Sequence, residues 1–197
     1  MDMVGATRDR IREHALALFT DRGYATASLR EIADRVGITK ASLYYHFPSK
    51  QDLLVAVVQP LLTQWHDIVT DAEASGRTPA DVHRILRRCV DTLLAHRAVA
   101  NLFLRDAAAI LPALAPLIAD IVETNARLRD WLAGPAPSAV ARIRAVAVLE
   151  LLRSALTAGA TLDDVPDELV RRTLLESAEL VLAAGRSGTP DQRGHAA

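Results

Sequence analysis

Residues 39–50 carry the side chains whose types best suggest contact with a nucleic acid. The segment reads Thr-Lys-Ala-Ser-Leu-Tyr-Tyr-His-Phe-Pro-Ser-Lys. Lysine attracts phosphate, small residues allow close approach to base edges, and tyrosine can donate to phosphate or contact a thymine methyl group. We therefore expect Lys40, Ala41, Ser42 and Tyr45 to face a duplex, and we expect Lys50 to reach the backbone beside the groove.

The preceding residues predict two short helices joined by a tight turn. Ser28 and Glu31 have the spacing of a capping box. Gly37 can take the positive φ that ends a helix sharply, Thr39 can cap the next helix, and Pro48 ends it. The apolar residues of the first helix repeat at helical spacing and predict one buried face: Leu29, Ile32, Ala33 and Val36.

The second helix of this unit has one apolar side and several polar ones. At about 100° per residue, Leu43 and Phe47 fall on its inward side, while Ala41, Ser42 and Tyr45 point away. The residues between these two sides of the helix have alternatives to DNA contact. Tyr44 could be partly buried, and His46 could bond to a local carbonyl. A helix-turn-helix of this form can place its second helix in the DNA major groove.

The stretch from Ser28 to Lys50 closely resembles the helix-turn-helix of TetR-type (tetracycline-repressor-like) transcriptional regulators. The resemblance rests on Ile-Ala at 32–33, Gly37, Thr39-Lys40, Leu43-Tyr44, Phe47 and Lys50. It implies an all-α fold of about nine helices, with a three-helix DNA-binding head and a C-terminal effector-binding and dimerisation domain. It also implies a repressor that a small molecule releases from a double-stranded DNA operator. The alternative is a DNA-binding regulator without a small-molecule effector, controlled by a protein partner or by its abundance. The full set of DNA contacts then becomes Ser28, Thr39, Lys40, Ala41, Ser42, Tyr44, Tyr45, His46 and Lys50.

The rest of the chain reads as helices throughout. We expect helices over about 8–22 (capped by Thr7), from 49 onward, 79–96, 99–109, 114–132, 138–158 and from 166 or 167 to 185. Leu111-Pro112 should break one of them. The expected domains are a head at residues 5–65 (helix-turn-helix about 28–47), a ligand-binding and dimerisation domain at 66–185, and a disordered tail at 186–197.

Pro60 lies inside the helix expected after Ser49. Proline cannot donate a backbone hydrogen bond, so this helix either kinks there or stops and a new one starts. In the family that the chain resembles, this helix links the head to the effector domain. A kink at Pro60 would then be a hinge that transmits effector binding to the head.

A small-molecule pocket and a dimer interface are expected in the C-terminal part. Helices between residues 50 and 134 should enclose a mainly aliphatic pocket, which favours an apolar or amphipathic effector. Its candidate residues are Trp65, His66, Cys89, Asn101, Phe103, Arg105, Asn125 and Trp131. The last two helices should pair with their copies in a homodimer, unless their apolar faces pack on the core of the same chain.

Composition excludes several other classes of function. Residues 1–50 hold 8 Lys and Arg against 6 Asp and Glu, whereas the other 147 residues hold 15 against 18, which suits a protein that touches DNA at one end. A single cysteine, no long apolar run and no apolar N-terminal segment predict a cytoplasmic protein that does not enter membranes. The chain lacks His-x-x-x-His, Cys-x-x-Cys, Gly-x-Gly-x-x-Gly and Gly-x-Ser-x-Gly, so we expect no catalysis, metal or cofactor.

Overall fold

The computed structural model describes residues 3–162 and 164–184, and these residues form nine helices and no strand. The helices are α1 Met3–Arg22, α2 Leu29–Val36, α3 Lys40–His46, α4 Lys50–Ala74, α5 Pro79–Ala95, α6 Arg97–Ala113, α7 Ala115–Ala133, α8 Ala139–Thr161 and α9 Asp167–Ala183. The predicted all-α class is confirmed. The predicted tail at 186–197 and the predicted helix end at Gly185 lie outside the described residues.

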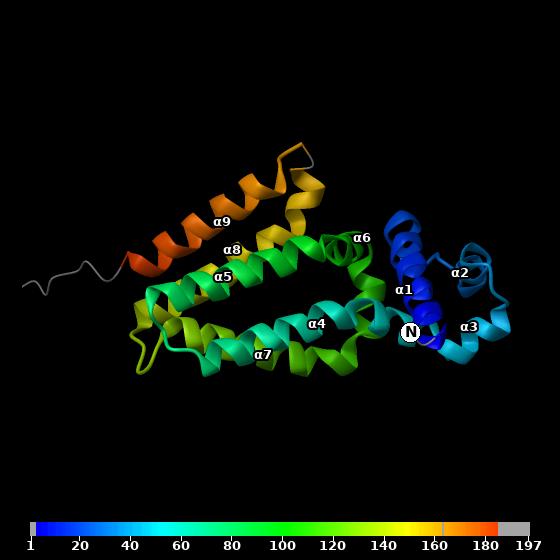
Figure 1. Cartoon of the computed structure of the whole chain (residues 1–197), viewed down its shortest axis with the longest axis horizontal. Coiled ribbons are helices and arrows are strands. Elements are labelled where there is room, and N and C mark those ends of the chain that lie inside the picture. The colour runs from blue at the N-terminus through cyan, green and yellow to red at the C-terminus, as the bar shows by residue number, and fades with distance from the viewer. Residues whose placement is uncertain (1–2, 163, 185–197) are drawn as a thin grey trace, which may run out of the picture.

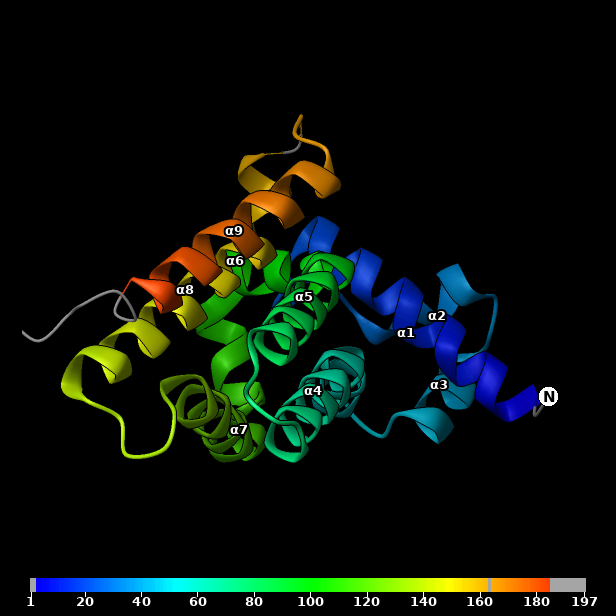
Figure 2. The ribbon, with the colours of Figure 1, turned by 60° about the vertical axis from the view of Figure 1, so that its left-hand side comes forward.

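The helices form two parts that follow one another along the longest axis of the molecule. Figure 1 shows α1, α2 and α3 gathered at one end as a head, and α5, α7, α8 and α9 at the other. Helix α4 leaves the head and runs into the second part. In the turned view of Figure 2, α2 and α3 again lie away from α8 and α9, while one end of α1 approaches α6.

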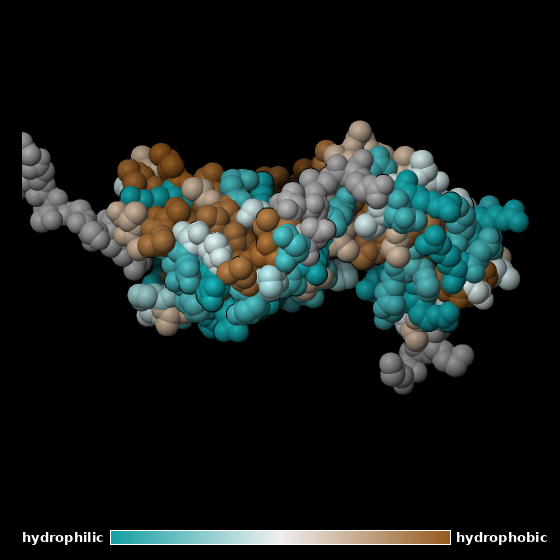
Figure 3. Space-filling model, turned by 90° about the horizontal axis from the view of Figure 1, so that it is seen from above, coloured by the Kyte–Doolittle hydropathy of each residue, from teal (hydrophilic) through white to brown (hydrophobic). Residues whose placement is uncertain are grey.

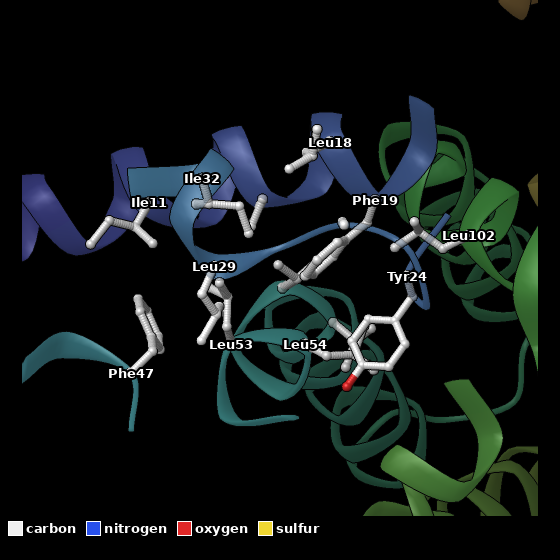
Figure 4. Packing of buried hydrophobic residues seen from close by; sticks show 14 of the residues in the cluster. Ile11, Leu18, Phe19, Tyr24, Leu29, Ile32, Phe47, Leu53, Leu54 and Leu102 are labelled. Carbon is white, nitrogen blue, oxygen red and sulfur yellow. The ribbon is translucent and has the colours of Figure 1, made fainter. Parts of the chain in front are cut away.

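A cluster of buried apolar side chains holds the head together. Its members include Ile11, Phe19, Ile32, Leu43 and Phe47, each at most 1% exposed. Figure 4 shows Phe19, Tyr24 and Leu54 close together where α1, the following loop and α4 meet. The same cluster includes Val99, Leu102, Ile110 and Leu114, so helix α6 packs on the head although it follows the domain boundary expected at residue 65.

A second apolar cluster forms the core of the C-terminal part. It joins residues of α4, α5, α7, α8 and α9, including Ile68, Leu86, Leu128, Leu152 and Ala178. The buried face of α5 consists of residues at helical spacing: Ile85, Leu86, Cys89, Val90, Leu93 and Leu94. The capping box of Thr78 with Asp81 and Pro79 in the first turn start this helix where the sequence predicts it.

Three helix boundaries differ from the sequence prediction. Helix α1 begins at Met3, so Thr7 lies inside the helix rather than at its cap. Pro60 lies inside the single helix α4, which makes the alternative of two separate helices wrong. Helix α6 continues through Leu111-Pro112, and its non-helical residue is Asp106, with φ −143° and ψ 36°.

The break in α6 coincides with a tertiary contact that spacing alone cannot show. The side chain of Asp106 accepts a hydrogen bond from the backbone of Ala25 in the head, 81 residues earlier in the chain. A proline predicts a break because it lacks an N–H, but packing against neighbouring helices can keep a helix intact around it. Here the non-helical residue is the one whose side chain bonds to the head.

No single helix among the described residues is long and apolar enough to cross a bilayer. Only a bent pair, Asp106–Ala113 with Ala115–Ala133, meets the length and composition requirement together, and its two parts meet at 89°.

Candidate nucleic-acid interface

Helix α2 is fixed at both ends by the residues that the sequence singles out. The Ser28 hydroxyl accepts from the Glu31 amide (3.2 Å), and the Glu31 carboxylate accepts from the Ser28 amide (3.0 Å). Gly37 has φ 78° and ψ 35°, and its amide donates back to Ala33, which ends the helix. The Arg10 guanidinium also donates to the Val36 carbonyl (2.7 Å), so α1 holds the last turn of α2.

Helix α3 begins at Lys40, three residues after Gly37, and its inward side packs on the core of the head. The Thr39 hydroxyl accepts from the Ser42 amide (3.1 Å) and caps the helix. Leu43 is fully buried and Phe47 is 1% exposed, and both belong to the core of the head. The guanidinium carbon of Arg8 lies 4.8 Å from the centre of the Phe47 ring, so α1 covers the end of α3 as well. These contacts fix the orientation of a seven-residue helix that would be marginal alone.

The opposite side of α3 faces outward. Tyr45 is 80% exposed and Tyr44 is 41% exposed, while Lys40 and Ala41 are exposed and Ser42 and His46 are half-buried. The Tyr45 and His46 rings are 5.5 Å apart, edge to face, and the Lys40 ammonium lies 5.5 Å from the centre of the Tyr44 ring. Two tyrosines, a lysine and small residues thus form one outward surface on a rigid support.

A hollow of about 460 Å³ lies between the start of α2 and the two ends of α3. The residues that line it are Ser28, Leu29, Arg30, Lys40, Tyr44, Pro48, Ser49 and Lys50. Four of the nine predicted contact residues therefore lie around one depression: Ser28, Lys40, Tyr44 and Lys50. Thr39, Ala41, Ser42, Tyr45 and His46 continue the surface along α3.

Arg30 is a member of this surface that the sequence reasoning missed. It is exposed in the first turn of α2, where backbone N–H groups already favour an anion, and it lines the hollow beside Lys40. A signal for it exists in the sequence, because Arg30 directly follows the buried Leu29 and cannot share its inward face.

Lys50 has a different environment from Lys40. Its ammonium donates to the Ala25 carbonyl (3.1 Å) and lies 4.7 Å from the centre of the Tyr24 ring. Burial lowers the pKa of Lys50, and the nearby carboxylates of Asp106 and Glu31 oppose that effect. The side chain ties the start of α4 to the loop before α2, so it positions the head, and its contact with DNA stays a prediction.

Among the described residues, those expected to line an effector pocket lie in several different environments, and their role stays a prediction. Trp65 and Asn125 do meet, because the indole N–H donates to the Asn125 amide oxygen (3.1 Å), whereas Phe103 packs on the core of the head. Cys89 is fully buried, and burial raises the pKa of its thiol to about 12, so it is a core residue.

The remaining pocket candidates also differ from one another in burial and in hydrogen bonding. His66 is exposed on α4, Trp131 is 7% exposed in the C-terminal core, and the Asn101 side-chain oxygen is buried without a hydrogen-bond partner in the described part of the chain. The side chain of Arg105 lies outside the described residues. Sequence spacing identified polar and aromatic residues on these helices but could not indicate which of them share a cavity.

The segment that contains α2 and α3 is similar to known regulatory proteins. A family model described as "Bacterial regulatory proteins, tetR family" matches residues 11–57, which cover most of α1, all of α2 and α3, and the start of α4. The transcriptional activator FasR of Mycolicibacterium smegmatis is 40% identical over 77 residues, which are 39% of this chain and 34% of FasR. The negative transcriptional regulator IcaR of the biofilm operon icaADBC in Staphylococcus aureus is 48% identical over 46 residues, which are 23% of this chain and 25% of IcaR.

The likeness to solved structures extends over most of the chain. The structure of a SmeT–triclosan complex matches with a TM-score of 0.71 and 21% sequence identity, over 91% of each chain. At this identity the match shows a shared fold. The chain covers only about a third of FasR and a quarter of IcaR, and for both relatives the matched segment is short.

Proposed function

Because the chain belongs to the TetR family of bacterial regulatory proteins, we propose that it binds a specific DNA operator as a homodimer and represses transcription from it. A small molecule bound in the C-terminal part would release it from the operator. The observation that carries the proposal is the outward face of α3, where Tyr45 is 80% exposed on a helix whose Leu43 and Phe47 are buried.

Tyr45, which is 80% exposed, contributes little to the packing of the chain itself. Removing large aromatic area from water is favourable, so a side chain such as Tyr45 left outside the core is best explained by a partner surface. A braced helix of seven residues fits the width of the major groove, and its small residues Ala41 and Ser42 let the backbone approach base edges.

The charge on this side of the head suits a phosphate backbone. Lys40 and Arg30 are both exposed next to the outward face of α3. Lys40 lies in the first turn of its helix, where its charge opposes the helix dipole and slightly destabilises the free protein. A phosphate near Lys40 would turn that cost into an attraction.

The second part of the proposal concerns dimerisation. Helices α8 and α9 leave large apolar side chains exposed: Val140, Ile143, Val146, Leu169 and Leu180, which are 42–70% exposed. Figure 3 shows hydrophobic residues gathered on the part of the molecule formed by the C-terminal helices, whereas the head is mostly hydrophilic. Other apolar residues of α8 and α9 are buried in the core of the same chain: Leu149, Leu152, Leu175 and Ala178. A two-fold pairing of α8 and α9 would cover the exposed residues and present two heads to an operator.

Relatives support regulation in both directions. IcaR is named a negative regulator and FasR an activator, and the SmeT structure contains triclosan. We infer repression for this chain, relieved by an apolar or amphipathic ligand, and we place the protein in the cytoplasm, where the chromosome is accessible.

The test begins with the DNA that the purified protein retains from sheared genomic DNA. We expect sequencing to recover a palindromic site, and Tyr45→Ala to weaken binding to that site by about 1–3 kcal/mol relative to random DNA. His66→Ala serves as a matched control, because His66 is exposed on α4 outside the outward face of α3. Enrichment no greater than for random fragments would refute DNA recognition, and an equal loss on all sequences would show that Tyr45 contacts only the backbone.

A further inference from the structure

A cavity of about 510 Å³ lies at the end of the molecule farthest from the head. It is bounded by the connection between α4 and α5, the connection between α7 and α8, and the last turns of α9, which meet at one end of Figure 1. Its volume falls in the range of about 300–1,000 Å³ that is typical of small-molecule sites. The residues that the sequence suggests for an effector pocket are not among the described residues that line it.

The walls of this cavity are mainly aliphatic. The apolar side chains that line it are those of Pro79, Val82, Leu132, Ala133, Pro135, Ala141, Leu182 and Ala183. None of them is aromatic, so the cavity suits a flexible hydrocarbon chain better than a flat ring. Binding would remove the methylene groups of such a chain from water, which is favourable.

Two arginines supply the polar side of the cavity. Arg77 and Arg144 both line it, and within the described residues neither bonds to a carboxylate. The carboxylate that does line the cavity, Glu179, is instead 2.5 Å from the Nδ1 atom of His83. The cavity therefore has two guanidinium groups without an anionic partner in the described part of the chain.

The Arg77 side chain is held in place by its neighbours. Its guanidinium carbon lies 5.5 Å from the centre of the Trp131 ring. A Cβ atom at Gly134, where φ is 96°, would lie 3.2 Å from Arg77 Nη2, so the absence of a side chain there makes room for the guanidinium. Burial lowers the pKa of Arg77, which means that its positive charge is partly desolvated and would gain from an anion. A preorganised guanidinium can bind a carboxylate through two parallel hydrogen bonds.

We propose that this cavity binds a medium-chain aliphatic carboxylate, whose head group contacts Arg77 and Arg144 and whose chain lies against Val82, Leu132 and Leu182. Binding of the carboxylate to this cavity does not depend on DNA recognition. Its regulatory consequence rests on the proposed function, because the bound acid would be the effector that releases the operator.

Calorimetric titration of the full chain with decanoate, without DNA, tests the binding. We expect saturable binding of one decanoate per chain, and binding of 1-decanol at least about tenfold weaker, because a charge-assisted hydrogen bond contributes roughly 1.5–3 kcal/mol. Arg77→Gln and Arg144→Gln should each weaken decanoate binding by about tenfold or more. Arg87→Gln, at an exposed arginine elsewhere on α5, should leave it unchanged.

Ala141→Phe adds a test that does not depend on charge. It places a ring in the cavity and should abolish binding of both decanoate and decanol, while circular dichroism confirms that the variant is folded. Equal affinity for decanoate and decanol, no saturable binding, or full affinity in both arginine variants would overturn the proposal.

A second measurement separates this site from the DNA-binding proposal. Decanoate should release the wild-type protein from its operator in a gel-shift assay, and should fail to release Arg77→Gln at the same concentration. Binding of decanoate without release would refute the regulatory consequence alone. Absence of an operator would refute the proposed function and leave the calorimetric result unaffected.

Discussion

Ala25 in the head and Asp106 in α6 are joined by a hydrogen bond, with 2.6 Å between Ala25 N and Asp106 Oδ2. Asp106 is the non-helical residue at which α6 bends, and Ala25 lies in the loop that leads to the capped start of α2. The Lys50 ammonium donates to the carbonyl of the same Ala25. One residue of the head is thus held by α6 through its amide and by α4 through its carbonyl. This pair of bonds joins the loop before α2 to both α4 and α6.

Replacing Asp106 should loosen this connection. Asp106→Ala removes the acceptor of the Ala25 amide, and we expect the free energy of unfolding to fall by about 0.5–1.5 kcal/mol. Asp106→Asn keeps an acceptor oxygen, so its free energy of unfolding should fall by less than that of Asp106→Ala. Urea unfolding followed by circular dichroism measures the difference, with Asp67→Ala, at an exposed aspartate of α4, as the control. An Asp106→Ala protein as stable as the wild type would show that the bond contributes nothing.

Lys40 and Lys50 should respond differently to substitution. Lys40→Ala should lower the slope of log K against log salt concentration by about 0.9 for each phosphate that the protein no longer neutralises, because fewer counterions are released. Lys50→Ala should mainly lower the free energy of unfolding, because its ammonium holds the Ala25 carbonyl. The measurements are fluorescence anisotropy with operator DNA at several salt concentrations and urea unfolding. Arg87→Ala is the control. An unchanged slope in Lys40→Ala would show that Lys40 does not contact a phosphate of the operator.

Glu31 makes part of the stability depend on pH. Hydrogen bonds from the Ser28 amide and hydroxyl, and then the charge of Arg22, hold the pKa of Glu31 below its ordinary value of 4.5. Because the folded pKa is depressed, this contribution is fully present above pH 4.5 and is lost as the pH falls through the folded pKa. Glu31→Gln should therefore show a smaller loss of stability than the wild type as the pH falls from about 5 to about 3.

Thermal unfolding across that pH range gives the measurement. Glu13→Gln is the matched control, because Glu13 is exposed on α1, and its curve should follow the wild type. A Glu31→Gln curve parallel to that of the wild type would mean that the capping box does not titrate with folding.

Local signals in the sequence predicted most of the head correctly. Ser28, Gly37 and Thr39 act through bonds within three or four residues, so spacing alone indicates where α2 and α3 begin and end. The break in α6 could not be predicted in this way, because it coincides with a contact between Asp106 and Ala25. The pocket residues stay a prediction, since helical spacing indicates which face is apolar but not which faces leave space between them.

The exposed apolar residues of α8 predict the oligomeric state. Ile143 is 68% exposed, and in a two-fold pairing of α8 and α9 it would be desolvated against the partner. Ile143→Glu would place a charge in that interface, where it would lack a partner and cost several kcal/mol. We therefore expect a homodimer for the wild type and a monomer for Ile143→Glu in sedimentation velocity at the same concentration.

Val122→Glu provides the matched control for this prediction. Val122 is 62% exposed on α7, so the substitution has the same chemistry and nearly the same exposure outside α8 and α9. This variant should remain dimeric and should bind the operator like the wild type, whereas Ile143→Glu should lose most operator affinity because a single head reads only one half-site. If Ile143→Glu stayed dimeric while Val122→Glu dissociated, the interface would lie on α7 and not on the last two helices.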